Sequence, residues 1–385
     1  MTKLRFGAFM APFHARPGSN PTIGLHHDLK IAQHLDQLGY DEMWFGEHHS
    51  GGVELLGSPE MFCAWVAGQT KRIKVGTGVI SLPYHNPLWV AERAILLDHL
   101  TRGRFMLGIG PGALATDGDM LGLDVSQLRN YLQEDFPILM RLLRTDDLIS
   151  IDTGRYQLVD ARVQLDPYSD FDIAVTSVFT PSGPMLAGRF GIGLLQLSGL
   201  TPESLAVLPK HWETVEAQAT AYGTSVAPKD WRVVSIMHIA ETKDKAIEEV
   251  RYGLDHYFNY FQDVVGFERL LPAGRTFEAR LEWAMDTGYA VVGTPEDAVS
   301  KLHEMNEASG GRVGAFLHWA TDWASPDNTL KNYSIFADRV MPEFQGTLNR
   351  IRSSQDWVSR NSAEITGRLN DGAKQFAADH VQARV

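Results

Sequence analysis

An alternation of apolar, β-rich runs with helical patterns extends along most of this chain, and it restricts the fold more than any other feature. The runs are apolar on successive residues, which indicates strands that are covered on both faces of a parallel sheet. Eight such strands, each followed by a helical pattern, favour a closed (β/α)8 barrel of the α/β class over an open sheet. The expected strands are residues 4–10, 42–45, 73–80, 105–109, 173–178, 193–197, 232–240 and 313–319.

Helical spacing of apolar residues predicts the segments that follow these strands. They are residues 27–38, 61–67, 88–100, 126–143, 183–190, 202–222, 244–261, 295–308 and 327–344. Two stretches interrupt the alternation. Residues 154–168 are expected to form a small hairpin between the fourth and fifth strands, and residues 262–289 form a long insertion after the seventh strand. Such an insertion is typical of a mobile lid, although a surface excursion with one helix is an equal alternative.

The chain has 385 residues, a length that α/β barrels reach as one domain. We expect residues 1–346 to form the barrel. Residues 347–385 are polar, charged and alanine-containing. They predict a helical extension that packs on the barrel or on a partner subunit.

The charge balance and the single cysteine argue against several classes of protein. The chain carries 35 Lys and Arg against 47 Asp and Glu, a net charge of −12, which argues against binding to nucleic acid or an anionic membrane. Cys63 alone can form neither an internal disulfide nor a clustered-thiol metal site. The N-terminus lacks a signal-peptide core, and no run approaches the roughly 18 apolar residues of a membrane span. We therefore expect a cytoplasmic enzyme.

In a parallel barrel the catalytic groups gather where the strands end, and the best-marked strand end here is the loop Glu47-His48-His49. Adjacent side chains of an extended chain point in opposite directions, so His48 and His49 should not face one ligand. Because the chain also has no His-x-His or His-Glu-x-x-His pattern, we predict no metal site. One histidine acting as an acid, a base or a hydrogen-bond donor is favoured over a purely structural pair.

Glycines mark the next two strand ends. Gly76 and Gly78 end the third strand, where the missing side chains would let a flat ligand approach the backbone, and tight barrel packing is the alternative. A Gly-x-Gly-x-Gly string that includes Gly110 ends the fourth strand. Its spacing departs from the dinucleotide-binding pattern Gly-x-Gly-x-x-Gly, and Pro111 obstructs a helix there. We interpret this string as a strand end and loop beside a ligand.

The fifth and eighth strands also end in residues that suit a ligand. Thr180, Ser182 and Gly183 stand at the start of a predicted helix, where hydroxyls and free amides bind an oxyanion, most often phosphate. An ordinary helix cap by Ser182 is the alternative. His318 and Trp319 could wall a pocket for an apolar substrate, or could be structural. The histidines without strand-end context are expected at the surface; they are His26, His27, His211 and His380.

The order and spacing of several short motifs give the chain a family resemblance. It resembles the bacterial luciferase-like flavin monooxygenases, and within them most closely the limonene 1,2-monooxygenase subgroup. The resemblance extends from Leu4 to about Gly346. The motifs that carry it are residues 6–9, 39–44, 46–49, 75–79, 97–104, 292–296 and 336–342.

The resemblance implies a TIM barrel that holds reduced FMN supplied by a separate flavin reductase, or a deazaflavin in one branch of the family. With FMN, oxygen forms a hydroperoxide at the flavin C4a carbon, and one oxygen atom passes to a small, largely apolar organic substrate. His48 matches the catalytic histidine of the family, and Gly78-Val79 matches a bulged, often cis, peptide behind the flavin ring. The remaining implied contacts are Gly110, Thr180, Ser182 and Gly183 for the cofactor, and Tyr84, His85, His318 and Trp319 for the substrate.

The sequence also departs from the family pattern. Bacterial luciferase has a cysteine near the flavin where this chain has Gly110, and a phosphate-contacting arginine aligns with Pro111. These differences argue against light emission with a long-chain aldehyde. The implied enzyme is a homodimer or other homo-oligomer. A deazaflavin-dependent hydride-transfer enzyme and a non-catalytic flavin-binding partner subunit are the alternatives, and epoxidation, hydroxylation and Baeyer–Villiger insertion all stay open.

Overall fold

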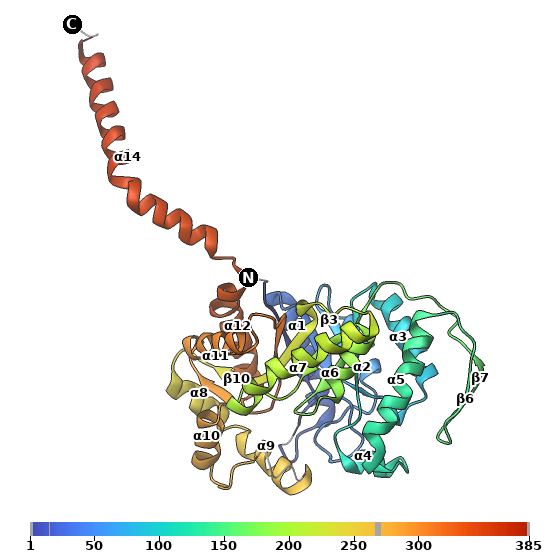
Figure 1. Ribbon diagram of the computed structural model, residues 1–385. Coiled ribbons are helices and arrows are strands. Elements are labelled where there is room, and N and C mark those ends of the chain that lie inside the picture. The colour runs from blue at the N-terminus through green and yellow to red at the C-terminus, as the bar shows by residue number, and fades with distance from the viewer. Residues whose placement is uncertain (1–2, 15, 266–270, 383–385) are drawn as a thin grey trace. The chain divides into compact units, whose positions relative to one another are not determined.

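Eight parallel strands close into a barrel in the computed structural model, which describes residues 3–14, 16–265 and 271–382. Each strand pairs with the next in the order β1-β2-β3-β5-β8-β9-β10-β12, and β12 pairs with β1 (Figure 1). The eight predicted strands and the α/β barrel fold are therefore confirmed. The strands are β1 (Arg5–Met10), β2 (Glu42–Phe45), β3 (Lys74–Thr77), β5 (Phe105–Gly110), β8 (Asp172–Ser177), β9 (Gly193–Gln196), β10 (Trp231–Ile239) and β12 (Ala315–Trp319), and the two-residue β4 (Ile80–Ser81) pairs with β5.

Helices cover the outside of this barrel. They are α1 (Pro21–Leu38), α2 (Pro59–Ala67), α3 (Pro87–Thr101), α5 (Leu128–Arg144), α6 (Ser182–Phe190), α7 (Pro202–Tyr222), α11 (Pro295–Ala308) and α12 (Pro326–Arg339). Local sequence sets their ends. The side chain of Asn20 accepts hydrogen bonds from the first amides of α1, and Gly39, with φ of 84°, ends that helix in the left-handed conformation.

The barrel interior is filled by large apolar side chains from alternate strand positions. Trp44 and Met106 are fully buried, and they pack with residues such as Phe9, Leu195 and Leu317. Side chains at successive positions of a strand face opposite sides, so the intervening residues point toward the helices. The interior is thus a packed core, and the chemistry must lie at its ends.

The two predicted insertions are present. Between β5 and β8, the strands β6 (Ile149–Asp152) and β7 (Gln157–Ala161) form an antiparallel hairpin that begins a few residues before the predicted one. After β10 the chain forms α8 (Lys243–Val250), α9 (Leu254–Tyr260), a π-helical turn (Phe261–Val265), α10 (Phe277–Asp286) and β11 (Ala290–Gly293), which pairs with the second half of β10. Part of the lid expected over residues 262–289 lies outside the described residues, and lid motion stays a prediction.

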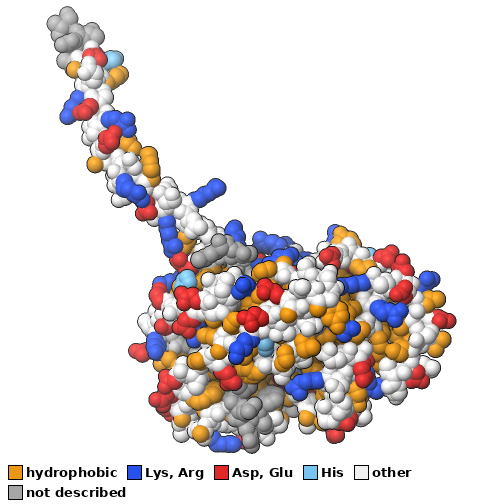
Figure 2. All heavy atoms as spheres, viewed as in Figure 1, with side chains coloured by type: hydrophobic (Ala, Val, Ile, Leu, Met, Phe, Trp, Pro, Cys, Tyr) orange, Lys and Arg blue, Asp and Glu red, His pale blue; other side chains and the backbone are white. Residues whose placement is uncertain are grey.

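The chain divides into two compact units, Met1–Met341 and Pro342–Val385. The second unit holds the long α14 (Asn349–Gln382) and all of α13 (Met341–Gln345) except its first residue. Where the extension packs stays a prediction. Among the helices that the structure describes, none is long and apolar enough to cross a membrane. On the visible face of the barrel unit, Lys and Arg side chains are interspersed with Asp and Glu (Figure 2).

Candidate active site

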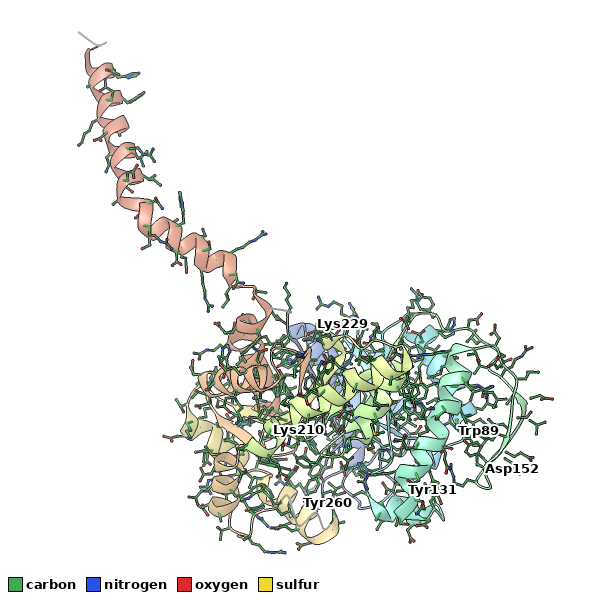
Figure 3. The ribbon with its side chains drawn as sticks, viewed as in Figure 1. Trp89, Tyr131, Asp152, Lys210, Lys229 and Tyr260 are labelled. Atoms are coloured by element: carbon green, nitrogen blue, oxygen red, sulfur yellow. The ribbon has the colours of Figure 1, made fainter. Side chains whose placement is uncertain are left out.

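The loop after β2 meets two short helices, α4 (Ala115–Met120) and α9, at the carboxyl-terminal end of the barrel strands (Figure 1). Figure 3 labels Tyr260 of α9 at this end and Lys229, which precedes β10, at the other. The loop begins at Gly46, where an added Cβ would lie 3.4 Å from the carbonyl oxygen of Gly78. The histidine loop and the end of β3 are therefore neighbours.

Glu47 is buried, and its carboxylate accepts hydrogen bonds from three groups of this site. Its carboxylate accepts hydrogen bonds from His85 Nε2 at 2.6 Å, from His49 Nε2 at 3.0 Å and from the Ser81 amide at 2.5 Å. Burial acts to raise the pKa of Glu47, but the hydrogen bonds from His49 and His85 outweigh it and lower that pKa. Glu47 and His49 thus bond each other within the loop. Side-chain alternation predicted only that His48 and His49 do not face one ligand.

His48 lies between two carboxylates. Its Nδ1 is 3.2 Å from Asp117 Oδ2, and its Nε2 is 3.5 Å from Glu54 Oε1. Burial acts to lower the pKa of His48, but the charge of Glu54 and the hydrogen bond to Asp117 raise it overall. An imidazolium ion donates from both nitrogens, so the arrangement favours the protonated ring.

Asp117 anchors the whole loop from α4. Besides contacting His48, its carboxylate accepts the His49 amide at 3.1 Å and the Ser50 hydroxyl at 2.5 Å. Burial acts to raise the pKa of Asp117, but the hydrogen bonds from His48 and Ser50 lower it overall. Asp117 is therefore ionised at neutral pH and can hold a positive charge on His48.

Glu54 connects His48 to the insertion after β10. The Tyr260 hydroxyl at the end of α9 donates to Glu54 Oε2 at 3.1 Å. Burial raises the pKa of Glu54, although His48 opposes that shift. A buried carboxyl with a raised pKa beside a histidine is suited to exchanging a proton with it.

Glycines at the ends of β3 and β5 serve two different purposes. An added Cβ on Gly76 would lie 2.8 Å from Trp44 Cε3, so packing inside the barrel accounts for this residue. The Gly78–Val79 peptide is cis, the conformation that the family resemblance implied. An added Cβ on Gly110 would lie 2.7 Å from Val79 Cγ2 and 2.8 Å from Thr176 Oγ1. Val79, Gly110 and Thr176 therefore form one contiguous surface across three strand ends.

The segment after β8 presents hydroxyls at the start of α6. Thr180 Oγ1 and Ser182 Oγ are 3.1 Å apart, and Gly183 packs against the backbone of Thr176, where an added Cβ would overlap the carbonyl oxygen. Ser182 is the first residue of α6, preceded by Pro181, and this helix has no side-chain cap. The alternative of an ordinary cap by Ser182 is therefore wrong, and its hydroxyl and the first amides of α6 can serve an oxyanion.

The structure brings only some of the residues predicted to line the substrate pocket to this end of the barrel. Tyr84 packs edge-on against the His49 ring, and His85 bonds Glu47, so both lie at the histidine loop. Trp319 lies against Phe9 at the end of β12, with ring centroids 6.1 Å apart. Within the described parts of the chain, the buried Tyr84 hydroxyl and Trp319 Nε1 have no hydrogen-bond partner.

The prediction that His318 lines the substrate pocket is wrong. Its ring packs against Phe336 of α12, with centroids 4.3 Å apart, and against Tyr333. Leu317 and Trp319 pack with the barrel interior, so His318 between them must face the helix layer. Burial lowers the pKa of His318 to about 3, which keeps it neutral.

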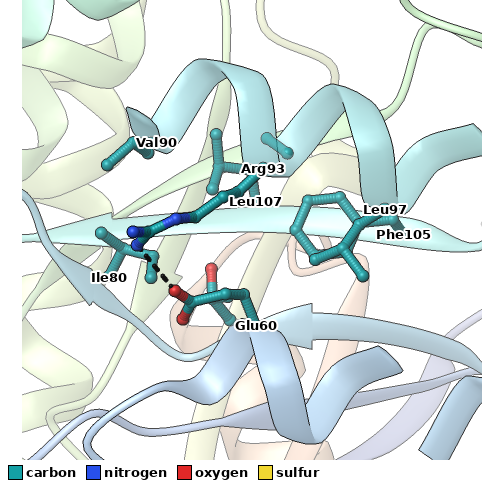
Figure 4. A pocket seen from close by; sticks show the side chains of 9 residues that line it. Glu60, Ile80, Val90, Arg93, Leu97, Phe105 and Leu107 are labelled. Atoms are coloured by element: carbon teal, nitrogen blue, oxygen red, sulfur yellow. Dashed lines mark hydrogen bonds and ion pairs between the residues drawn. The ribbon is translucent and has the colours of Figure 1, made fainter. Parts of the chain in front are cut away.

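Two cavities of the structure are lined by residues other than those of the candidate site. One, of about 10 Å³, lies between α3 and the strands beside the Glu60–Arg93 ion pair (Figure 4). It has room for about one water molecule. The other, of about 220 Å³, is lined by residues at the strand starts, including Asp172, Asp230 and Arg232. Neither is a substitute for the strand-end site.

A flavin fits the residues at the strand ends. Gly110 leaves a surface that a Cβ would fill, and the start of α6 offers amides without a side-chain cap. Over the described residues, no group of three or more His, Cys, Asp and Glu side chains has a geometry suited to a metal ion.

Sequence reasoning missed Asp117, Glu54 and Tyr260. They belong to three segments that only the fold brings together. Glu54 had one detectable signal, since it is a single carboxylate in the apolar stretch Val53-Glu54-Leu55-Leu56. Such a residue is rarely buried unless it is paired.

Comparison with known proteins places these features in context. Residues 4–312 match the luciferase-like monooxygenase family. The chain is 42% identical to limonene 1,2-monooxygenase of Rhodococcus erythropolis, over 98% of this chain and 97% of that protein. It is 37% identical to 4-hydroxyprotoasukamycin monooxygenase of Streptomyces nodosus subsp. asukaensis, over 94% and 98% of the two chains. Among solved structures, the oxygenating constituent of 3,6-diketocamphane monooxygenase from Pseudomonas putida, in complex with FMN, superimposes with a TM-score of 0.71 at 23% identity, over 89% and 99% of the two chains.

Proposed function

Because this chain belongs to the luciferase-like monooxygenase family, we propose that it uses reduced FMN and molecular oxygen to oxygenate a small, largely apolar organic molecule. The family binds flavin, and the relative with 42% identity is a monooxygenase of limonene, an apolar hydrocarbon. We further propose that a separate flavin reductase supplies the reduced cofactor, and that the enzyme is a cytoplasmic homodimer or other homo-oligomer.

The observation that carries the proposal is the position of His48 between Asp117 and Glu54 beside the strand-end glycines. Asp117 fixes the ring from Nδ1 and favours its protonated form. Nε2 then holds a proton next to a buried carboxyl that can accept or return it. His48 is thus the acid, base or hydrogen-bond donor at the point where the strands end.

The cofactor residues have separate tasks in this proposal. Bound reduced FMN supplies the electrons that activate oxygen. Thr180, Ser182 and the first amides of α6 bind its phosphate, and Val79 and Gly110 provide the surface against its ring system. Exclusion of water by the surrounding apolar core protects the reaction from solvent.

The substrate residues follow from the same end of the barrel. Tyr84, His85 and Trp319 line the substrate side, with the Tyr84 hydroxyl and Trp319 Nε1 as donors that a ligand can use. Their aromatic surfaces suit an apolar molecule.

A coupled turnover assay tests the proposal. Purified protein is mixed with a flavin reductase, NADH, FMN and a panel of terpenes and ketones, and oxygenated product is measured against hydrogen peroxide. We expect product from at least one substrate, and a His48→Ala variant that loses about 100-fold or more in product formation while keeping its fold. His26→Ala, on the outside of α1, is the control. Peroxide alone across the whole panel, or tight binding of a deazaflavin in place of reduced FMN, would refute the proposal.

A further inference from the structure

A buried polar cluster lies directly beneath the segment proposed to bind phosphate. Its members are Ser177 at the end of β8, Gln196 at the end of β9 and His211 on α7, and at most 5% of each is exposed. His211 was expected at the surface, and that prediction is wrong. It occupies the apolar face of α7 with Leu208, whereas its neighbour Lys210, labelled in Figure 3, is exposed.

Gln196 links the two loops that follow β8 and β9. Its Nε2 donates to the carbonyl oxygen of Val178 at 2.7 Å and to Ser198 Oγ at 2.9 Å. Its Oε1 faces His211 Nδ1 at 2.9 Å, which fixes the histidine nitrogen as the donor. One amide side chain therefore determines the position of both loops.

Ser177 and His211 complete the support. The Ser177 hydroxyl donates to the carbonyl oxygen of Thr180 at 3.2 Å, and it lies 3.4 Å from His211 Nδ1. Burial lowers the pKa of His211, although a hydrogen bond to the Phe179 backbone opposes that shift, so the ring is neutral at pH 7. The ring acts through its hydrogen bonds and not through a charge.

The segment after β8 is thus hydrogen-bonded to the buried cluster through its backbone. The carbonyl groups of Val178 and Thr180 accept hydrogen bonds from the buried cluster, whereas the Thr180 side chain is exposed and Ser182 is half-buried. Burying three polar side chains is favourable only when their partners are in place, so the cluster allows one arrangement of the segment.

We propose that Gln196 and His211 are positioning residues that hold residues 178–182 in the conformation that binds the phosphate group of the flavin. The inference rests on the proposed function. Neither residue needs to touch the cofactor. Their contribution is to orient the Thr180 and Ser182 hydroxyls and the start of α6 before the ligand arrives, which lowers the cost of ordering the site on binding.

Comparison of FMN with riboflavin, which lacks the phosphate, tests this inference. Dissociation constants for both reduced flavins are measured anaerobically with the wild-type protein and with Gln196→Met and His211→Phe. Loss of buried hydrogen bonds of this kind corresponds to about a tenfold or larger rise in the FMN dissociation constant. The riboflavin constant should change by less than about twofold, because no phosphate contact is lost.

Two further variants separate positioning from general packing. His211→Asn keeps a donor near the Nδ1 position and should recover most of the FMN affinity. His238→Phe removes another buried histidine, which bonds Glu249 at 2.8 Å away from this segment. It should lower stability but leave the ratio of FMN to riboflavin affinity unchanged.

The outcomes are distinct. Equal weakening of FMN and riboflavin binding in the Gln196 and His211 variants would overturn the positioning role, as would unchanged binding of both. A wild-type protein that binds riboflavin as tightly as FMN would show that the segment makes no phosphate contact. A wild-type protein that binds neither flavin would refute the proposed function itself, and the inference would fall with it.

Discussion

At the scale of single residues, His48 and His14 each contact two carboxylates, which raise the pKa of the histidine. His48 lies between Asp117 and Glu54 in the candidate active site. His14, on the loop after β1, lies 2.9 Å from Asp28 and 3.6 Å from Asp322. The first pair of contacts belongs to the candidate active site, whereas the second bears on stability.

Replacement of Asp117 by Asn should lower the pKa of His48. The variant removes the negative charge at Nδ1, so the protonated ring loses one of the two carboxylates that stabilise it. Titration of the His48 ring by NMR checks this, and product formation in the coupled assay should fall in parallel. Asp119→Asn, an exposed residue of the same helix, is the matched control. An unchanged His48 titration in the Asp117 variant would contradict the assigned contact.

The His14 contacts predict a loss of stability at alkaline pH. Burial acts to lower the pKa of His14, but the hydrogen bonds with Asp28 and Asp322 raise it to about 10. The folded state therefore keeps a proton that the unfolded state releases near pH 6.5, and stability falls as the pH rises from 6.5 to 10. Burial raises the pKa of Asp28 to about 6, so Asp28 is ionised in both states over most of that window and adds little slope.

Urea unfolding at a series of pH values tests this effect. The wild-type free energy of unfolding should decrease by up to about 1.4 kcal/mol per pH unit more than that of His14→Asn between pH 7 and 9.5. His26→Asn, whose ring packs against Trp65, should keep the wild-type slope. Parallel slopes for wild type and His14→Asn would show that His14 is not protonated in the folded protein.

At the scale of helices and strands, the sequence predicted the pattern well and the irregularities poorly. All eight barrel strands and the ends of α7 and α11 were predicted, because apolar periodicity and capping residues are local signals. The helix predicted over residues 244–261 is instead broken into α8 and α9. An added Cβ on Gly253 would overlap the backbone of Asp322, so a loop from the far end of the chain decides where that helix stops.

The errors at the site have a similar origin. The predictions for His318 and His211 rest on whether a strand end is near and not on which face of the strand or helix each residue occupies. Alternation along β12 places His318 outside, and the spacing of Leu208, His211 and Trp212 places His211 on the buried face of α7. Both were recoverable from the sequence. The contact of Asp117 with His48 was not, since it depends on a loop closing across the barrel.

Packing between strands makes Gly76 intolerant of a side chain. An added Cβ would lie 2.8 Å from the Trp44 ring and 3.0 Å from Met106. Trp44 cannot move aside easily, because its Nε1 bonds Glu42 at 3.0 Å. Gly76→Ala should therefore lose about 1–3 kcal/mol of stability through overpacking.

Chemical denaturation checks the Gly76 prediction against a matched glycine. Gly68, which follows α2, has a helical backbone with φ of −67°, and its nearest atoms would be 3.6 Å from an added Cβ. Gly68→Ala should be neutral or stabilise the protein by up to about 1 kcal/mol. If the two substitutions had equal effects, backbone entropy and not the Trp44 contact would govern Gly76.

At the scale of the whole molecule, the two ends of the barrel hold different kinds of residues. The family resemblance inferred from the order of short motifs is confirmed, and the candidate active site lies where the strands end. At the strand starts, Arg232 is buried and bonds Glu42 at 2.6 Å and Asp172 at 3.1 Å. Satisfied ion pairs of this kind at the amino-terminal end indicate a structural role.

Glu42→Leu should therefore destabilise the protein without altering the site. Removing one partner of a buried pair leaves Arg232 poorly compensated and costs about 3–5 kcal/mol in the free energy of unfolding. The double variant Glu42→Leu/Arg232→Met removes both charges and should be more stable than Glu42→Leu alone, which denaturant unfolding of both proteins measures. In each variant the folded fraction should bind reduced FMN with wild-type affinity, whereas His48→Ala should show the reverse, with lost turnover and retained stability. Loss of FMN affinity in the Glu42 variants would mean that the two ends of the barrel are coupled, because the charge cluster at the strand starts would then set the geometry at the strand ends.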